Sequence, residues 1–310
     1  MNGFGPKNAS IVSVCIPVLN EADHLPRLLA QLQAQRDVEL DIIVADGGST
    51  DGSICRLPPT VRVVTSARGR GAQMNAAARA ARGEWLLFLH ADTQIDAPRL
   101  LADAVEALAL ARAQLGDDRI AGHFALQFDR EQGGHTLLFR YMEEKTALNR
   151  PGTINGDQGM LLTRRFFESL GGFDENRGML EDQELAARIF DAGRWMTLPG
   201  RLITSARRFE ALGPRRVYAF MALTMSAWAT GNDSFLDQLP ALYKRRQPDG
   251  RLDMRGVLSD WLRAHRGRLP AVARYALANA WQLPFFLNVL SRYCRRHNRA
   301  TPESVRAARR

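Results

Sequence analysis

The amino-acid sequence predicts an α/β protein with an open, mostly parallel, Rossmann-like sheet flanked by helices and followed by a helical C-terminal extension. Three observations favour this fold. Within residues 11–89, short apolar runs alternate with segments of helical periodicity, which is typical of βαβ units. Some of these runs are almost continuously apolar, as strands buried on both faces are. After about residue 210 the strand pattern stops, and helices with arginines on their polar faces follow.

The first expected strand covers residues 11–19, an apolar run rich in β-branched residues. Cys15 lies inside this run and is expected to be a core residue. Asn20 is expected to cap the helix that follows, and Pro26 falls within the first two turns of that helix. Its buried stripe is expected to consist of four leucines at helical spacing: Leu25, Leu28, Leu29 and Leu32.

The remaining elements follow from the same two periodicities. Strands are expected at residues 40–45, 61–65, 85–89, 120–128 and 159–163. Helices are expected at residues 72–81, 97–113, 137–148 and 181–192, and in a segment that stops at Gly171 and Gly172. A single core rarely exceeds about 250–300 residues. We therefore divide the 310 residues into a sheet domain, 1–209, and a basic helical region, 210–310.

Cysteine usage and the N-terminal residues bear on the compartment. Three widely spaced cysteines make no disulfide framework, so we expect a reducing environment, the cytoplasm. The first residues have neither the basic nor the apolar segment of a signal peptide. No apolar run reaches the roughly 20 residues that span a bilayer.

Positive charge is concentrated in the last third of the chain. Residues 201–310 hold 21 Lys and Arg against 7 Asp and Glu, whereas the first 200 residues hold 21 against 26. Such a basic region suits nucleic acid, an anionic membrane or phosphorylated substrates. Because no zinc-binding spacing or aromatic RNA-binding motif accompanies the charge, we expect no nucleic-acid partner.

Polar residues follow three of the expected strands directly. They are Asn20 and Glu21 after the first strand, Asp46, Ser49 and Asp51 after the second, and His90 and Asp92 after the fourth. The carboxyl ends of parallel strands meet at one edge of a sheet, where ligands bind. Each residue alone is equally well explained as a turn or capping group. Together they favour a site that handles a cation, a ribose or a base.

Spacing excludes two familiar nucleotide sites. The loop after the first strand reads VLNEAD and lacks the GxGxxG fingerprint of dinucleotide-binding proteins. Gly69 and Gly71 follow the third strand instead, and Met74 stands where a third glycine would be needed. No GxxxxGK[ST] motif is present, so P-loop chemistry is excluded as well.

Longer motifs carry a family resemblance. The segments SVCIPVLNEADHLPRLLAQL, DIIVADGGSTDGS and ARGRGAQMNAAARAARGEWLLFLHADT resemble the start of a family 2 glycosyltransferase with the GT-A fold. The later segments NGDQGMLLTRRFFESLGGFDE and LEDQELAARIFDAG are similar to that family's acceptor-side motifs. The resemblance covers about residues 11–208 and is nearest to small, soluble bacterial members with FLHADT and GDQG. It implies transfer of a sugar, with inversion, from a UDP- or GDP-sugar to an unidentified hydroxyl acceptor.

The resemblance also implies roles on the donor side. Matches to the nucleotide pocket are Pro17, Asn20 and Glu21 in its lining loop, Asp46 at the base with Ser49 and Asp51 close by, and Arg70 and Asn75 near the phosphates. Arg207 and Arg208 resemble a basic element that closes over the diphosphate, with a solvated pair as the alternative.

For the metal and the acceptor side, the resemblance implies a further set of roles. Asp92 matches the final acid of the DxD element, which holds Mg²⁺ or Mn²⁺ against the diphosphate. His90 replaces the first acid, and it is expected to hydrogen-bond the ribose or a phosphate, or to ligate a softer metal, with a structural hydrogen bond as the alternative. Asp182 matches the general base, with a helix-capping acid as the alternative. Expected on the acceptor side are Asp157, Gln158 and Glu181, the first two with a polar turn as the alternative.

Two other functions stay open at this point: a sugar-1-phosphate nucleotidyltransferase and a catalytically inactive GT-A binding module. The loop VLNEADHLPR lacks the glycines and the lysine that would steady a triphosphate. Aromatic and aliphatic residues beside arginines further predict a peripheral contact with the inner face of an anionic membrane and a lipid-linked acceptor. Those residues are Trp281, Phe285, Phe286, Leu287, Arg292, Arg295 and Arg296. Packing on the sheet, or against a second subunit in a homodimer, is the alternative.

Overall fold

The computed structural model describes residues 11–55, 57–131 and 133–307, with side chains as far as residue 295. The chain forms two compact units. The first contains the chain up to Asp129 together with Lys145–Ser205, and the second contains Arg130–Glu144 and the chain from Ala206 onward. The second unit is therefore discontinuous in sequence, which the division after residue 209 did not include.

A seven-stranded sheet forms the centre of the first unit, with strand order β3-β2-β1-β4-β6-β5-β7. The strands are β1 (Ile11–Val18), β2 (Glu39–Asp46), β3 (Val61–Thr65), β4 (Trp85–Phe88), β5 (Ile120–Asp129), β6 (Met160–Thr163) and β7 (Arg194–Ser205). All neighbouring strands pair in parallel except that β6 runs antiparallel to both β4 and β5. The predicted open, mostly parallel sheet is confirmed.

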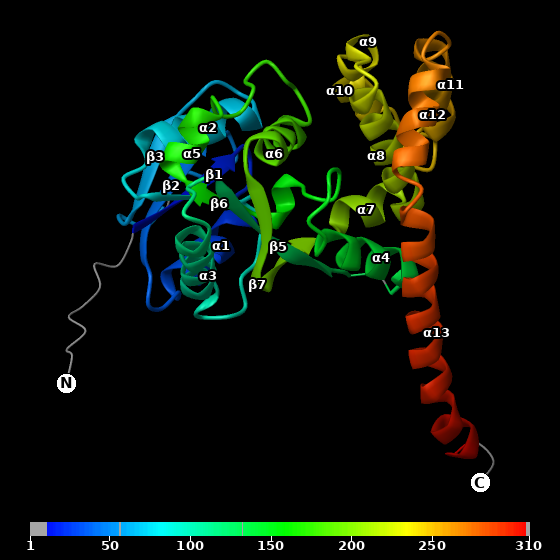
Figure 1. Ribbon diagram of the computed structural model, residues 1–310, viewed down its shortest axis with the longest axis horizontal. Helices are drawn as coiled ribbons and strands as arrows, with labels where there is room; N and C mark the ends of the chain where they lie inside the picture. Colours follow the sequence, from blue (N-terminus) through cyan, green and yellow to red (C-terminus); the bar gives the residue numbers. More distant parts are fainter. Residues whose placement is uncertain (1–10, 56, 132, 308–310) are drawn as a thin grey trace. The chain divides into compact units, whose positions relative to one another are not determined.

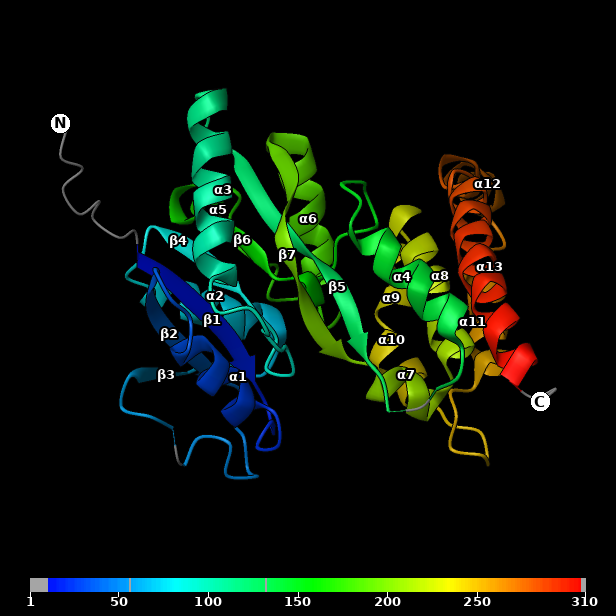
Figure 2. The same ribbon diagram turned by 90° about the horizontal axis from the view of Figure 1, so that it is seen from below.

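Helices cover both faces of this sheet, giving three layers (Figure 1). One face carries α1 (Leu25–Gln33) and α3 (Leu100–Leu115), and the other carries α2 (Arg70–Ala80), α5 (Arg164–Ser169) and α6 (Glu181–Ala192). Figure 2, turned by 90° from Figure 1, shows α3 lying along the sheet. A 3₁₀ turn, η1 (Gly156–Gln158), leads into β6.

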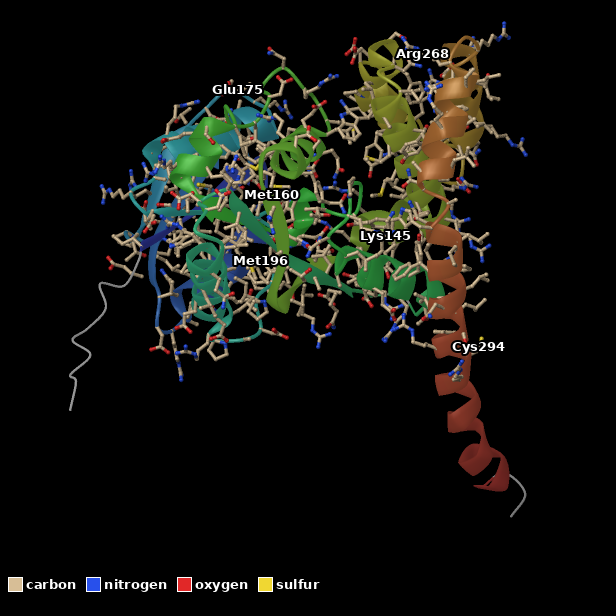
Figure 3. The ribbon with its side chains drawn as sticks, in the orientation of Figure 1. Lys145, Met160, Glu175, Met196, Arg268 and Cys294 are labelled. Atoms are coloured by element: carbon tan, nitrogen blue, oxygen red, sulfur yellow. The ribbon has the colours of Figure 1, made fainter. Side chains whose placement is uncertain are left out.

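Alternation along the strands builds two hydrophobic cores, one on each face of the sheet. In β1, Val12, Val14 and Ile16 pack on the α1 side, whereas Cys15 packs on the α2 side. Cys15 is wholly buried, and burial raises the pKa of its thiol far above the usual value, as befits a core residue. Met160 of β6 belongs to the same α2-side core (Figure 3).

The first loop corrects one local prediction. Asn20 does not cap α1, because the helix begins only at Leu25 and His24 occupies the cap position without a side-chain bond. Asn20 instead adopts a left-handed conformation, with φ of 58°, which asparagine tolerates better than most residues. Pro26 does lie in the first turn of α1, and the four predicted leucines are all buried. The side chain of Asn20 can therefore make hydrogen bonds elsewhere.

Helices make up the second unit. They are α4 (Thr136–Thr146), whose last two residues belong to the first unit, α7 (Arg207–Leu212), α8 (Pro214–Ala229), α9 (Asp233–Leu236), α10 (Leu239–Lys244), α11 (Met254–Ala264), α12 (Leu269–Ala278) and α13 (Gln282–Ala307). Aromatic side chains recruit α4 to this unit, since Phe139 packs on Phe209 and Tyr141 on Tyr218, with ring centroids 6.0 and 6.1 Å apart. This packing explains why a segment before residue 209 belongs here.

The start of α13 differs from its sequence-based interpretation. Phe285 and Phe286 are half-buried, and their ring centroids lie 5.7 and 5.5 Å from that of Tyr141. They therefore pack within the unit, and the exposed apolar residues beside them are Leu283 and Leu287. The side chain of Arg296 lies outside the described residues. Among the helices in the described part of the chain, none is both long and apolar enough to cross a bilayer.

Candidate active site

The strand ends named by the sequence lie side by side at one edge of the sheet. In β1 and β2, Val18 is in register with Asp46, and Pro17 with Ala45. On the other side β1 pairs with β4, whose last residue leads directly to Leu89 and His90. The loops after β1, β2 and β4 therefore share one edge, as predicted from the parallel arrangement.

Hydrogen bonds tie the first two loops to one another. The Asn20 side-chain oxygen accepts from the Thr50 N–H at 2.8 Å, and the Asn20 N–H donates to Ser49 Oγ at 3.0 Å. Asp51 accepts from the N–H groups of Ala22 and Ser53, at 2.9 Å each. The hydrogen bond from the Ser53 hydroxyl is the main cause that lowers the pKa of the exposed Asp51 carboxyl. Ser49 and Asp51 thus brace the loops.

Asp46 and Glu21 each add one hydrogen bond to this braced pair of loops. Asp46 Oδ1 accepts from the Ser49 N–H at 2.9 Å, which holds the turn after β2 closed. The Glu21 N–H donates to Ser53 Oγ at 2.8 Å. The backbone of both loops is therefore set by side chains of the SerThrAspGlySer turn, before any ligand is considered.

Gln73 is a positioning residue that the sequence interpretation missed. Its amide nitrogen donates to the carbonyl oxygens of Val18 and Ala45, at 2.6 and 2.9 Å, and so ties α2 to the ends of β1 and β2. The side chain is 3% exposed. A glutamine at a buried position of the alanine-rich α2 was the available signal, because buried amides need partners.

Asn75 bonds to a different part of the chain from the one expected. Its amide nitrogen donates to the Phe173 carbonyl and to Glu175 Oε1, both at 2.9 Å, and its oxygen accepts from the Phe173 N–H at 2.9 Å. These contacts hold the loop that begins at Gly172, where a Cβ would lie 2.7 Å from Asn75 Oδ1. A contact of Asn75 with a nucleotide stays a prediction.

His90 and Asp157 form the first link between the strand edge and η1. The two side chains are 2.6 Å apart, from Nδ1 to Oδ1, and His90 is the more buried of the pair. Burial by itself would lower the pKa of His90, but the bond to Asp157 and the charge of its carboxylate outweigh burial and raise it. This pair holds η1 against the end of β4.

Asp182 forms the second link to η1. The Asp182 Oδ2 atom accepts from the Gly156 N–H at 2.7 Å, and Oδ1 accepts from the Gln183 N–H at 2.8 Å. A Cβ on Gly156 would lie 2.9 Å from His90 Nε2 and 3.3 Å from Asp182 Oδ2. The side chains of His90 and Asp182 therefore both approach the position that a side chain at residue 156 would occupy, and glycine leaves that position free.

An unusual backbone conformation at Leu180 precedes the helix that carries Asp182. Leu180, directly before α6, has φ of 72°, a left-handed conformation that is strained for a leucine. Strain of this kind, of order 1–3 kcal/mol, persists where the surroundings enforce it, commonly at functional sites. The carboxylates of Glu181 and Asp182 fall in the first turn of α6, where the helix dipole stabilises negative charge.

Arg70 and Glu181 form an ion pair across the site. Arg70 Nε lies 2.6 Å from Glu181 Oε1, and the Glu181 side chain is only 2% exposed. Burial raises the pKa of Glu181, Arg70 counteracts this, and the charge of Asp182 adds to it. Arg70 also interacts with the charges of Asp182 and Asp157. It therefore places one positive charge among these three acids, a role the donor-side interpretation did not include.

Gln158 lies behind the site and not on its surface. Its side chain is wholly buried, its oxygen accepts from the Asn155 N–H at 2.9 Å, and its nitrogen donates to the Thr146 carbonyl at 2.8 Å. The same nitrogen is 2.8 Å from Nδ1 of the buried His123. These bonds support the polar-turn alternative for Gln158, because the amide is used inside the protein to hold η1.

Comparison with known proteins agrees with this architecture. The model of glycosyl transferase family 2 matches residues 13–171, which include every loop at the strand edge and η1. The chain belongs to glycosyltransferase family 2. It is therefore a glycosyltransferase with a GT-A fold, and both predictions are confirmed.

Relatives of this glycosyltransferase occur in several bacteria. Rv1514c, a glycosyltransferase of Mycobacterium tuberculosis, is 29% identical over 193 residues, which is 58% of this chain and 69% of the relative. The succinoglycan biosynthesis protein ExoO of Rhizobium meliloti is 30% identical over 196 residues, covering 59% of this chain and 56% of ExoO. A mannosyltransferase of Pyrobaculum calidifontis, solved with GDP-Man and Mn²⁺, has a similar fold, with a TM-score of 0.52 at 22% identity over 93% of this chain and 76% of its own.

The Asp92 carboxylate, just after β4, suits a hard divalent cation that is held by few protein ligands. Asp92 is half-buried, and no described residue donates a hydrogen bond to its carboxylate. Within the described chain, no cluster of three or more His, Cys, Asp or Glu side chains is arranged around a metal position. Mg²⁺ is commonly held by one or two carboxylates plus substrate phosphates, so a single strand-end carboxylate fits that mode.

Arg207 and Arg208 begin α7 in the second unit of the glycosyltransferase, and both side chains are exposed. Their role at a diphosphate stays a prediction. Exposure of both side chains is equally compatible with the solvated alternative.

Proposed function

We propose that this glycosyltransferase moves a sugar from a nucleotide-diphospho-sugar, a UDP- or GDP-sugar, to a hydroxyl acceptor, with inversion and with the help of a divalent metal. The observation that carries the proposal is that the side chains of Asp182 and His90 both lie next to Gly156. Gly156 thus brings a carboxylate of α6 close to the strand end that would face the donor diphosphate.

Asp182 is the proposed general base. An inverting transfer needs one base, opposite the leaving group, to accept the proton of the acceptor hydroxyl. Backbone N–H groups hold both oxygens of Asp182, so the carboxylate is oriented before an acceptor binds. Arg70 pairs with the buried Glu181 and also interacts with the charge of Asp182, so a cation stands beside the proposed base.

The braced loops after β1 and β2 form the proposed nucleoside pocket. The turn at Asp46 and the hydrogen bonds of Asn20 with Ser49 and Thr50 hold this backbone in place without a ligand. Asp46 is the proposed partner of the base, and Pro17 lines the pocket from β1. Because these polar groups are already held in place, they lose little conformational entropy when a ligand binds. Such a fixed pocket suits the nucleotide, the part that different sugar donors share, better than the sugar, which varies.

Asp92 is the residue that would hold Mg²⁺ or Mn²⁺ at the diphosphate, next to His90. The metal would act as a Lewis acid that neutralises charge on the leaving nucleoside diphosphate. His90, positioned by Asp157, is then directed at a ribose or phosphate oxygen. Asp157 itself is proposed to border the acceptor side, since its side chain is 45% exposed.

Ligand-induced thermal stabilisation tests this proposal. UDP, GDP, UTP and GTP are compared, each with and without Mn²⁺, followed by a panel of nucleotide sugars in a hydrolysis assay. We expect a diphosphate with Mn²⁺ to stabilise the protein most and one nucleotide sugar to be hydrolysed slowly. A preference for triphosphates would contradict the proposal and favour nucleotidyl transfer. Diphosphate binding without hydrolysis or transfer of any donor would favour an inactive binding module.

A further inference from the structure

Exposed leucines recur along α12 and at the start of α13. Four of them are 58, 76, 64 and 53% exposed: Leu269, Leu277, Leu283 and Leu287. Exposed alanines fill the intervening positions at steps of three or four residues, at Ala273, Ala276 and Ala280. None of the residues of α12 is buried. We name these seven residues the leucine stripe.

The opposite side of α13 is the one that packs within the second unit. Val289 is wholly buried, and Phe285 and Phe286 contact Tyr141. The Tyr141 hydroxyl also donates to Gln282 Oε1 at 3.0 Å. The helix therefore already has an inner apolar face, and the leucine stripe is a second one that the unit leaves uncovered.

Arginines border the leucine stripe without matching acids. Residues 261–295 contain six arginines and no Asp, Glu or Lys. Arg263 pairs with Asp260, and Arg292 pairs with Glu144. For the other four, no carboxylate partner occurs among the described side chains; they are Arg266, Arg268, Arg274 and Arg295. Figure 3 labels Arg268 at the start of α12 and Cys294 beyond the stripe on α13.

Charge decides between the occupants that such a surface can have. A second copy of this chain would bring unpaired arginines against unpaired arginines, which is unfavourable. A nucleic acid would neutralise the arginines and leave the leucines exposed to water. An anionic bilayer satisfies both, because the leucines enter the interface while the arginines stay at the headgroups.

We propose that the leucine stripe, together with the four arginines that lack a carboxylate partner, is a docking surface for an anionic membrane. The surface places α12 and the first turns of α13 in the plane of the headgroups. Each basic residue near such a membrane strengthens binding about fivefold. This inference rests on the second unit alone and does not depend on the proposed chemistry of the first.

Vesicle co-sedimentation of the full chain tests the proposal. Vesicles of phosphatidylcholine alone are compared with vesicles in which about a third of the lipid is anionic phosphatidylglycerol. Both are tested at low and at high salt. We expect binding to the anionic vesicles at low salt and a loss of at least about tenfold at high salt, where exposed charges are screened. Absence of binding to anionic vesicles at low salt overturns the proposal.

Matched variants identify the surface. The triple variant Leu277→Gln, Leu283→Gln and Leu287→Gln should lose binding, and so should the triple variant Arg266→Gln, Arg274→Gln and Arg295→Gln, by on the order of a hundredfold. All six side chains are exposed, so the fold is expected to survive, which circular dichroism checks. The control is Leu110→Gln with Leu115→Gln, two exposed leucines of α3 in the first unit.

Two results would contradict the assignment. Equal loss of binding in the control and in the leucine variant would mean that exposed leucines in general, and not this stripe, drive sedimentation. A dimer seen by light scattering that the leucine variant abolishes, without any binding to vesicles, would assign the stripe to a second copy of the chain.

Discussion

The Asp182 carboxylate accepts a hydrogen bond from the backbone N–H of Gly156, with 2.7 Å between Oδ2 and the nitrogen. The two residues come from different elements, α6 and η1, separated by 26 positions in the sequence. The bond aligns the acid with the loop that His90 also contacts through Asp157. The predictions below begin from this pair.

Replacing Asp182 by Asn should abolish turnover and spare donor binding, because the amide keeps one acceptor for the Gly156 N–H but cannot take a proton. The expected loss of kcat is on the order of a hundredfold to ten-thousandfold, as for other general bases. Steady-state kinetics and calorimetry with the donor nucleotide measure the two effects. Asp191→Asn, at an exposed position of the same helix, is the control and should be normal. Near-normal turnover in Asp182→Asn would make Asp182 a helix-terminal acid only.

Replacing Gly156 by Ala should reduce turnover without unfolding the protein. The new Cβ would lie 2.9 Å from His90 Nε2 and 3.3 Å from Asp182 Oδ2, so both side chains must shift. A displacement of about 1 Å can cost about a hundredfold in rate. Gly133→Ala, where a Cβ meets nothing within 4 Å, is the matched control. If both variants have the same kcat, the Gly156 backbone does not position the two side chains for catalysis.

Replacing Asp92 by Ala should remove the Mn²⁺ dependence of nucleotide diphosphate binding and leave the melting temperature unchanged. No described hydrogen bond to this carboxylate is lost, so the stability of the folded protein should change little. Calorimetry with and without Mn²⁺ measures the effect, for which we expect at least about a tenfold drop in affinity, the loss of one charge-assisted contact. Asp96→Ala, an exposed acid four residues on, serves as the control. Unchanged metal dependence would exclude Asp92 as the metal ligand.

Replacing Asp46 by Ala should weaken binding of the nucleoside part of the donor, with or without metal. The change also releases the Ser49 N–H from its bond to Asp46 Oδ1. Calorimetry with uridine and guanosine monophosphates separates this effect from the diphosphate. Asp51→Ala is the informative comparison, because it loosens the same loops without removing the proposed contact to the base. Equal affinity of wild type and Asp46→Ala would contradict the assignment.

Acid should weaken the sheet through Asp41. Its carboxylate accepts from Arg62, from the Ser13 hydroxyl and from the Arg82 N–H, at 2.8, 2.7 and 2.9 Å. Burial raises the pKa of Asp41, but these bonds and the charge of Arg62 outweigh it and lower the pKa in the folded state. A lowered folded pKa means that Asp41 stabilises the fold fully above the unfolded value, about 3.9, and that this contribution disappears as the pH falls through the folded value.

Asp41→Asn should therefore cost about 2 kcal/mol of unfolding free energy at pH 7, the usual size for bonds to a charged group. The difference from the wild type should shrink towards pH 3. Urea titrations at both pH values measure it, with Asp103→Asn on α3, half-exposed, as the control. A difference that does not change with pH would mean that the charge of Asp41 contributes nothing.

Local pattern accounts for most of the fold that was predicted. The strand at residues 61–65 and the helix at residues 181–192 have the predicted bounds. A β-branched run and an amphipathic period depend only on residues close together in the sequence, so they can be recognised without the tertiary structure. The antiparallel direction of β6 was not predicted. Four apolar residues bury equally well in either direction, so only the pairing with β4 and β5 decides it.

Side-chain partners needed the tertiary structure. The family motifs pointed to Asp182, Asp92 and the strand-end loops, but not to the pairing of Arg70 with Glu181 or to the use of Gln158 inside the core. Motif spacing records which residue types occur together, whereas a hydrogen bond depends on where two distant elements meet.

The amino-acid sequence predicted six of the seven strands, most helices of the first unit and the edge of the sheet at which polar loops gather, since these depend on periodicity and on short-range turns. It gave no bounds for β7 or for the helices that follow β7. The tertiary structure alone decided that α4 joins the second unit and that Phe285 and Phe286 turn inward to Tyr141, leaving Leu283 and Leu287 exposed. Apolar residues are equivalent in a sequence pattern. Which of them is buried depends on the surfaces that other parts of the chain bring against them.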